Sequence, residues 1–341
     1  MTDTPAAKRD AHAASCPGPA ATSFAPGSNE TAHKLEALEA LLRDLAPVAL
    51  GFSGGVDSTF LAAMCARAIP QKALLVHLNS PFVGTPERAS HDELAHAFGL
   101  PTISLAFDPF ADEDIVANGP DRCYLCKRAG FTRITEAARA WAAEQGFGPN
   151  TICVLDGSNA DDAAATDRPG MRALRELGVR SPLMETGWTK AEEREMLRTW
   201  GYRTWNLPAG ACLATRVVTG ERLTPQKVAA ARACEDYLHT LGCTQVRARI
   251  ADGELHIEGS PEDLARICAS SEDASATSSQ ALAGARSTDR VPAAGTAAGE
   301  SASKLQLSRN VLAQLNALAK TNGIARIAPE AHPYRRGSMN R

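Results

Sequence analysis

The chain has 341 residues, more than a single hydrophobic core usually supports, so two domains are expected. A net charge of −3 and a pI near 6.3 exclude a strong overall attraction to nucleic acid or to an anionic membrane. The longest apolar runs, such as Ala73–Val76, are far shorter than the ~20 residues that a membrane-spanning helix needs. Residues 1–30 contain no apolar core of a signal peptide, so we expect a disordered tail and a cytoplasmic protein.

Apolar spacing predicts alternating helices and strands between residues 31 and 205. Helices are expected over 33–45, 58–68, 86–98, 131–144 and 189–200, and strands just before residue 51 and over 73–78, 102–107 and 151–155. This alternation predicts an α/β fold, a doubly wound parallel sheet with helices on both faces. Ligands gather at the carboxyl ends of such strands, so the loops that begin at residues 51, 79, 108 and 156 should surround one crevice.

Residues 206–341 no longer show the regular alternation of strand and helix, and their pattern predicts a smaller α+β domain. Helices are expected over 225–241, 261–268 and 307–320, and strands over 245–250, 254–258 and 324–327. Residues 269–303 are almost all Ala, Ser, Thr, Gly and isolated charges, which bury too little apolar surface to become ordered. We therefore expect a disordered insertion within this domain.

A glycine pair flanked by hydroxyl groups joins the first strand to the following helix. Gly54 and Gly55 let backbone N–H groups approach an anion, the helix presents its positive end, and Ser53 and Ser58 add hydroxyl donors. Asp57 would hold Mg²⁺ against the phosphates. The loop lacks the Lys of a Walker P-loop, and its pattern SGGVDS instead resembles the pyrophosphatase loop of enzymes that split ATP between its α- and β-phosphates. The alternative is a surface turn without function.

Three of the nine cysteines stand out from the rest. Cys123 and Cys126 have the two-residue gap that lets two thiolates face one metal or cluster, and Cys212 supplies a distant third thiol. Three thiolates would leave one iron of a [4Fe–4S] cluster open, and an open iron can carry an extra sulfide. A redox pair, half of a zinc site and uncoordinated thiols remain alternatives. Cys65 and Cys153 lie in apolar segments and are expected to be core residues.

Several charged and polar residues are candidates for binding anions or nucleotide. Arg247 and Arg249 project from one face of a strand and, with Arg216, suit bidentate phosphate recognition. Lys127 follows the CxxC motif and would stabilise negative charge on sulfur or on a phosphoryl group. Each of these side chains has the alternative of being simply solvated. Asp156 and Asn159 follow a strand and would bind the nucleotide or its metal, or else form an ordinary turn.

Six motifs taken together resemble the ATP-dependent sulfur transferases that build the nickel-pincer nucleotide cofactor of lactate racemase. The motifs are SGGVDS, Arg122–Lys127, Asp156–Asp161, Asp167–Met171, Ala211–Arg216 and Tyr334–Asn340. The match runs in order from about residue 33 to residue 340, without the N-terminal tail and the insertion. One departure is His256, where relatives typically have an Arg, so a contact by that basic residue is in doubt.

The resemblance implies that the protein adenylates a carboxylate of pyridinium-3,5-biscarboxylic acid mononucleotide and then replaces AMP with sulfur. Some members sacrifice the sulfur of a cysteine that matches Cys212. Others add the CxxC motif and hold a [4Fe–4S] cluster, and the presence of Cys123 and Cys126 places this chain with them. Cys212, Lys127 and Asp57 would then be catalytic, with ATP and Mg²⁺ as further cofactors, and the arginines would hold the mononucleotide phosphate. Expected partners are the nucleotide substrate, other enzymes of this cofactor's biosynthesis and further copies of the chain.

Three other functions fit parts of the sequence. A transfer-RNA thiolase can use the same loop with three cysteines on a cluster, but the mild acidity of this chain and the lack of a basic tract interleaved with aromatic residues disfavour it. A synthetase that adenylates a carboxylate for attack by ammonia would not need three thiols. A non-catalytic module that binds nucleotide or metal would release no pyrophosphate from ATP.

Overall fold

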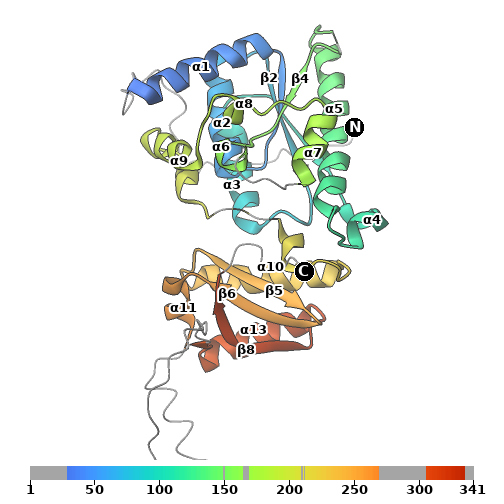
Figure 1. Ribbon diagram of the computed structural model, residues 1–341, viewed down its shortest axis with the longest axis vertical. Helices are drawn as coiled ribbons and strands as arrows, with labels where there is room; N and C mark the ends of the chain where they lie inside the picture. Colours follow the sequence, from blue (N-terminus) through green and yellow to red (C-terminus); the bar gives the residue numbers. More distant parts are fainter. Residues whose placement is uncertain are drawn as a thin grey trace, which may run out of the picture.

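The computed structural model describes residues 29–148, 150–163, 169–208, 210, 212–268 and 305–334. The expected N-terminal tail up to residue 28, the expected insertion, and residues 167, 168, 211 and 335–340 of the six motifs lie outside the described residues. Figure 1 shows two sheets, the first surrounded by helices and the second below it.

The first sheet contains four parallel strands in the order β3-β2-β1-β4. The strands are β1 (Val48–Gly51), β2 (Ala73–Asn79), β3 (Thr102–Ala106) and β4 (Cys153–Leu155). Alternate residues of β1 and β2 enter different cores: Leu50 and Leu75 pack on one face, and Ala49 and Leu74 on the other. Burial on both faces explains why these strands are continuously apolar, and it confirms the predicted doubly wound α/β fold.

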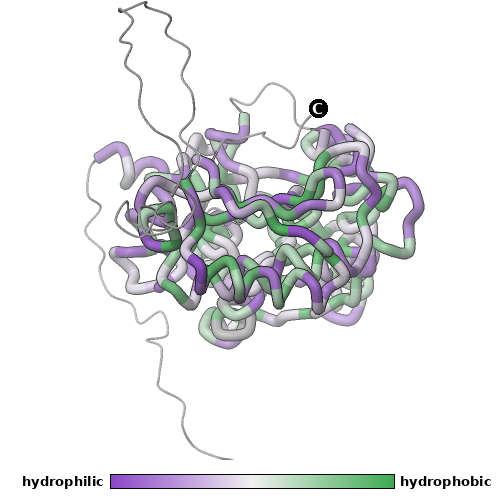
Figure 2. Tube along the Cα trace, turned by 90° about the horizontal axis from the view of Figure 1, so that it is seen from below, coloured by the Kyte–Doolittle hydropathy of each residue, from purple (hydrophilic) through white to green (hydrophobic). Residues whose placement is uncertain are grey.

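Helices cover both faces of this sheet (Figure 1). One core contains residues of α1 (Asn29–Leu45), α2 (Val56–Ala68), α3 (Thr85–Ala97) and α9 (Lys190–Thr199). The other core contains residues of α5 (Arg122–Glu144) and α7 (Pro169–Glu176). Short helices α4 (Glu113–Val116), α6 (Ala160–Ala163) and α8 (Pro182–Glu185) complete the connections. Figure 2 shows hydrophobic and hydrophilic stretches interspersed along the chain.

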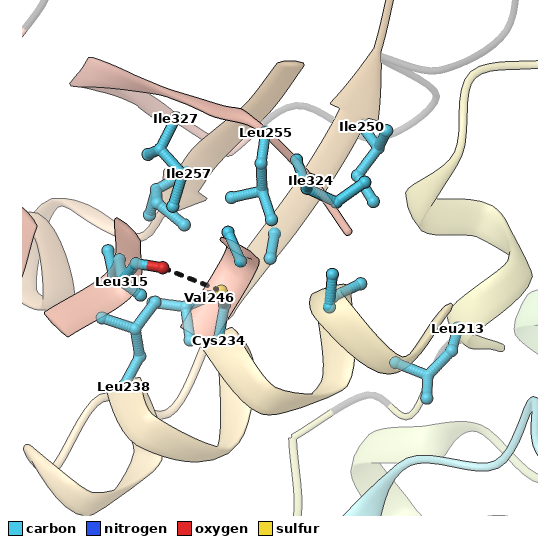
Figure 3. Close-up of a cluster of buried hydrophobic side chains, with 14 of the residues drawn as sticks. Leu213, Cys234, Leu238, Val246, Ile250, Leu255, Ile257, Leu315, Ile324 and Ile327 are labelled. Atoms are coloured by element: carbon cyan, nitrogen blue, oxygen red, sulfur yellow. Dashed lines mark hydrogen bonds between the residues drawn. The ribbon is translucent and has the colours of Figure 1, made fainter. Parts of the chain in front are cut away.

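The second sheet has the order β5-β6-β8-β7, in which only the central pair β6 and β8 is parallel. Its strands are β5 (Val246–Ala251), β6 (Glu254–Gly259), β7 (Leu305–Gln306) and β8 (Arg326–Pro333), and its helices are α10 (Pro225–Thr240), α11 (Pro261–Ile267) and α13 (Arg309–Thr321). Figure 3 shows its core, in which the buried Cys234 thiol points to the carbonyl oxygen of Leu315 at 4.0 Å. Cys234 is therefore a packing residue.

Hydrogen bonds at the start of α5 join this helix and the residues just before it to the segment 214–221, which precedes α10. The buried Asn118 has a φ of 58° and donates its amide hydrogens to the carbonyl oxygens of Val218 and Glu221, both at 2.9 Å. Arg122 donates to Asn118 Oδ1 at 2.6 Å and to the carbonyl oxygen of Ala214 at 3.0 Å. We call Asn118 and Arg122 the junction clamp, because they fasten the segment after Cys212 to the helix that carries the CxxC motif.

Each predicted helix and strand overlaps an element of the structure, and the differences lie at the ends of the elements. The largest difference is at the start of α5. Helix α5 begins at Arg122, well before the predicted start at residue 131, so the CxxC motif lies in its first turns. The sequence-based domain limits at residues 30 and 205 remain predictions. Among the described residues, no helix combines the length and apolar character that crossing a membrane requires.

Candidate functional site

A cavity of about 340 Å³ lies where the strands of the first sheet end. The pyrophosphatase loop forms one side of it, with Ser53, Gly55 and Asp57 among the lining residues. Cys126, Lys127 and Cys212 line it as well, although they come from distant parts of the sequence. The cavity lies at the carboxyl ends of β1 and β2, the edge of a parallel α/β sheet at which ligands are expected to bind.

Hydroxyl groups hold the pyrophosphatase loop in shape. Ser53 Oγ and Ser58 Oγ are 3.0 Å apart, and the backbone N–H of Gly55 donates to Ser53 Oγ at 3.3 Å. Gly54 adopts a φ of 78°, which favours glycine. Gly55 precedes the first residue of α2 and provides no side-chain cap, so the helix N-terminus is suited to an anion.

The carboxylate of Asp57 connects this loop to the segment before α6 and to α9. Its Oδ2 is 2.9 Å from Lys190 Nζ, and its Oδ1 accepts a hydrogen bond from Asn159 Nδ2 at 3.2 Å. The loop between β4 and α6 comes so close that a Cβ at Gly157 would lie 3.1 Å from the backbone nitrogen of Ser58. Asn159, predicted to bind nucleotide or metal, therefore positions Asp57 here, and direct contact with a ligand remains a prediction.

Glu193 is a further carboxyl group next to Asp57. Burial, and then the neighbouring Asp57, raise the pKa of Glu193 to about 10. Neither carboxylate oxygen has a hydrogen-bond partner among the described residues. The sequence analysis missed both Glu193 and Lys190, although their three-residue spacing on one helix places them on one face.

Asp156 is buried and its oxygens are occupied by protein groups. Ser181 Oγ donates to Oδ1 and Ser158 Oγ donates to Oδ2, both at 2.6 Å, and Lys127 Nζ lies 3.4 Å from Oδ2. Asp156 thus supports Lys127, which lines the cavity. The contact of Asp156 with a nucleotide or a metal stays a prediction.

The three candidate thiols are neighbours. Burial, and then the neighbouring thiols of Cys212 and Cys123, raise the pKa of Cys126 to about 12. Residue 212 is exposed overall, yet desolvation of its thiol raises its pKa, while Arg122 opposes the shift. Arg122 Nη2 also donates to Cys123 Sγ at 3.3 Å. The sulfur atoms suit a soft metal, but within the described part of the chain no three His, Cys, Asp or Glu side chains are grouped so that they could hold a metal ion.

The three candidate arginines differ in their surroundings. Arg216 and Arg247 line a second, small cavity that shares Glu87 and Gly210 with the first. Burial, and then the positive charge of Arg216, lower the pKa of Arg247, so an anion beside them would be favoured. Arg249 lines neither of these cavities and donates to Glu258 Oε2 at 3.0 Å and to the carbonyl oxygen of Thr215 at 2.8 Å. Arg249 thus supports the loop after Cys212.

Arg216 forms a buried bidentate ion pair with Glu235, with distances of 2.7 Å from Nε to Oε1 and 2.9 Å from Nη2 to Oε2. The substitution Glu235→Ala leaves a buried guanidinium without its counter-ion, and we expect it to lower the free energy of unfolding by about 3 to 5 kcal/mol. Urea-induced unfolding measures this loss. The matched control is Glu195→Ala in the exposed pair with Arg198, which should leave the urea midpoint nearly unchanged. Equal losses of unfolding free energy in the two variants would contradict the conclusion that Glu235 neutralises a buried guanidinium.

Comparison with known proteins agrees with the architecture of this site. The model of the asparagine synthase family matches residues 35–200, which contain the first sheet and the pyrophosphatase loop. Fold, loop and match together define an ATP-dependent enzyme of the ATP pyrophosphatase class.

Curated relatives identify the family within this class. The chain is 32% identical, over 67% of its length and 79% of the relative, to the pyridinium-3,5-bisthiocarboxylic acid mononucleotide synthase of Lactiplantibacillus plantarum. The chain belongs to the family of this synthase. It is also 32% identical, over 68% of its length and 83% of the relative, to an uncharacterized protein of Synechocystis sp.. An uncharacterized protein of Methanocaldococcus jannaschii is 25% identical over 64% of the chain and 80% of that relative.

Proposed function

We propose that the protein uses ATP to convert a carboxylate of pyridinium-3,5-biscarboxylic acid mononucleotide into a thiocarboxylate, with release of AMP and pyrophosphate. The observation that carries the proposal is a single cavity lined by both the pyrophosphatase loop and the thiol-bearing residues Cys126 and Cys212. Phosphate chemistry and sulfur chemistry therefore have adjacent sites. The name of the Lactiplantibacillus plantarum relative, a bisthiocarboxylic acid mononucleotide synthase, supports the choice of substrate.

The first step is the attack of a substrate carboxylate oxygen on the α-phosphorus of ATP. A bond forms between this oxygen and the phosphorus, the bond to the bridging oxygen breaks, and pyrophosphate leaves with the electron pair. The loop N–H groups and the hydroxyls of Ser53 and Ser58 would stabilise the leaving pyrophosphate. Asp57 would hold Mg²⁺ there, and Lys127 would offset the charge of the α-phosphate. The product, an acyl adenylate, has the good leaving group that a carboxylate lacks.

The second step is the attack of sulfur on the acyl carbon, which expels AMP. Cys126 and Cys212 line the cavity and would present the sulfur donor to it. Cys123, Cys126 and Cys212 would be the ligands of a [4Fe–4S] cluster, to which their soft sulfur atoms are suited. When bound, such a cluster would supply a transferable sulfide on the iron that has no protein ligand. Arg216 and Arg247 would bind the mononucleotide phosphate in the adjoining small cavity.

The test is turnover under anaerobic conditions with ATP, Mg²⁺ and the biscarboxylic acid mononucleotide. We expect equal amounts of AMP and pyrophosphate, a thiocarboxylate product by mass spectrometry, and no pyrophosphate without the acceptor. Mass spectrometry of the protein should find the sulfur of Cys212 retained after turnover, and its loss would show that the cysteine itself is the donor. Pyrophosphate release that requires transfer RNA instead of the mononucleotide would refute the proposal.

A further inference from the structure

Glu193 occupies a position at which an apolar side chain would be expected. On α9, the following residues at helical spacing, Met196 and Leu197, are buried in the core. Glu193 is also buried, with an exposed fraction of 0%, and among the described residues neither of its two oxygens has a hydrogen-bond partner of acceptable geometry. Burying an unsatisfied carboxyl group is costly, so it calls for a compensating partner.

The polar groups that act on Glu193 are Asp57, Asn159 and Lys190. Lys190 and Glu193 are three residues apart on α9, so this helix presents both an ammonium and a carboxyl group to Asp57. Lys190 Nζ already lies 2.9 Å from Asp57 Oδ2. One ammonium therefore faces two carboxyl groups, and a single positive charge cannot neutralise both. The pair of carboxyl groups needs either a proton or a cation.

We propose that Glu193 is a second carboxylate of the divalent-cation site at the pyrophosphatase loop and shares with Asp57 the ion that accompanies ATP. In nucleotide sites Mg²⁺ binds through one or two carboxylates together with phosphate oxygens and waters, so two protein ligands are sufficient. A divalent ion neutralises the negative charge of the second carboxylate, which the single ammonium of Lys190 cannot neutralise. The inference rests on the proposed function in one respect, namely that Asp57 faces the phosphates of ATP.

The test is binding of Mn²⁺, followed by electron paramagnetic resonance, to the full chain in the presence of an ATP analogue with a methylene bridge between its α- and β-phosphates. The substitution Glu193→Gln keeps the shape of a protonated carboxyl group and removes the charge. We expect it to weaken Mn²⁺ binding at least tenfold. The control is Glu192→Gln on the same turn, whose carboxylate contacts Lys34 at 2.7 Å and should leave Mn²⁺ affinity unchanged.

A second variant separates binding from folding. Glu193→Met matches the apolar stripe of α9 in size and should fold at least as stably as the parent, because it removes the buried carboxyl group. We expect the same loss of Mn²⁺ affinity in this variant. If the Mn²⁺ affinity of a folded variant falls by less than tenfold, the proposal is wrong. The pair of carboxyl groups then holds a proton instead of a cation. No sulfur acceptor is present, so this result is independent of whether thiocarboxylate forms.

Discussion

Replacing Cys212 with serine is expected to abolish thiocarboxylate formation while a single equivalent of pyrophosphate per site is still released from ATP. Cys212 lines the cavity beside Cys126, whereas the pyrophosphatase loop that activates ATP contains no cysteine. The variant should therefore form the acyl adenylate and stop there. Loss of a group that supplies or holds the nucleophile typically costs at least about a thousandfold in rate. Parallel assays of pyrophosphate and of thiocarboxylate measure the two steps separately.

The matched control for this experiment is Cys153→Ser. Cys153 is the first residue of β4 and lies at the amino end of the strand, away from the edge of the sheet that bears the cavity. This variant should form thiocarboxylate at a rate close to that of the parent protein. Continued sulfur transfer in Cys212→Ser, or equal losses of both reactions, would remove Cys212 from the sulfur-transfer step.

Replacing Asp57 with asparagine is expected to lower kcat/KM for ATP by at least about a hundredfold, because a carboxylate that holds Mg²⁺ stabilises charge at the leaving pyrophosphate. Asparagine retains the size of the side chain and can still contact Asn159. It leaves the Lys190 ammonium without its ion-pair partner at 2.9 Å. Pyrophosphate release as a function of ATP and Mg²⁺ concentration measures the effect, and thiocarboxylate formation should fall in parallel.

The exposed Asp44 at the end of α1 provides a control, since Asp44→Asn also removes one negative charge. This variant should keep the parent's kcat/KM. Thermal unfolding of Asp57→Asn in the absence of nucleotide should stay close to that of the parent, which separates a catalytic defect from misfolding. An Asp57→Asn protein that releases pyrophosphate within tenfold of the parental rate would place the metal elsewhere.

The sequence predicted the first sheet well because its central strands β1 and β2 are buried on both faces and read as continuous apolar runs. The short strands were bounded by polar turns, and the pyrophosphatase loop had a recognisable pattern of glycines and hydroxyls. Helix α5 was predicted to begin too late, because its first two turns contain Arg122, Cys123 and Cys126, which show no apolar periodicity. The CxxC motif thus concealed the start of the helix that carries it.

The partners of the charged candidates could not be predicted, because they depend on contacts between distant segments. Arg249 lies opposite His256 in the pairing of β5 with β6, yet its guanidinium reaches Glu258 on the neighbouring diagonal. Asp156 is occupied by Ser181, which belongs to no motif of the sequence analysis. Local spacing gave the residue types of the site, and tertiary packing determines which of them remain available to a ligand.

The junction clamp has a consequence for how an inorganic centre would assemble. Arg122 is adjacent in sequence to Cys123 and bonds directly to the chain just after Cys212 through the Ala214 carbonyl. The two thiol-bearing segments are therefore tethered before any iron arrives, and little conformational entropy is left to lose on metal uptake. A protein prepared without iron should keep its tertiary structure and accept iron and sulfide as a rigid receptor, in contrast to small domains that fold only around their metal.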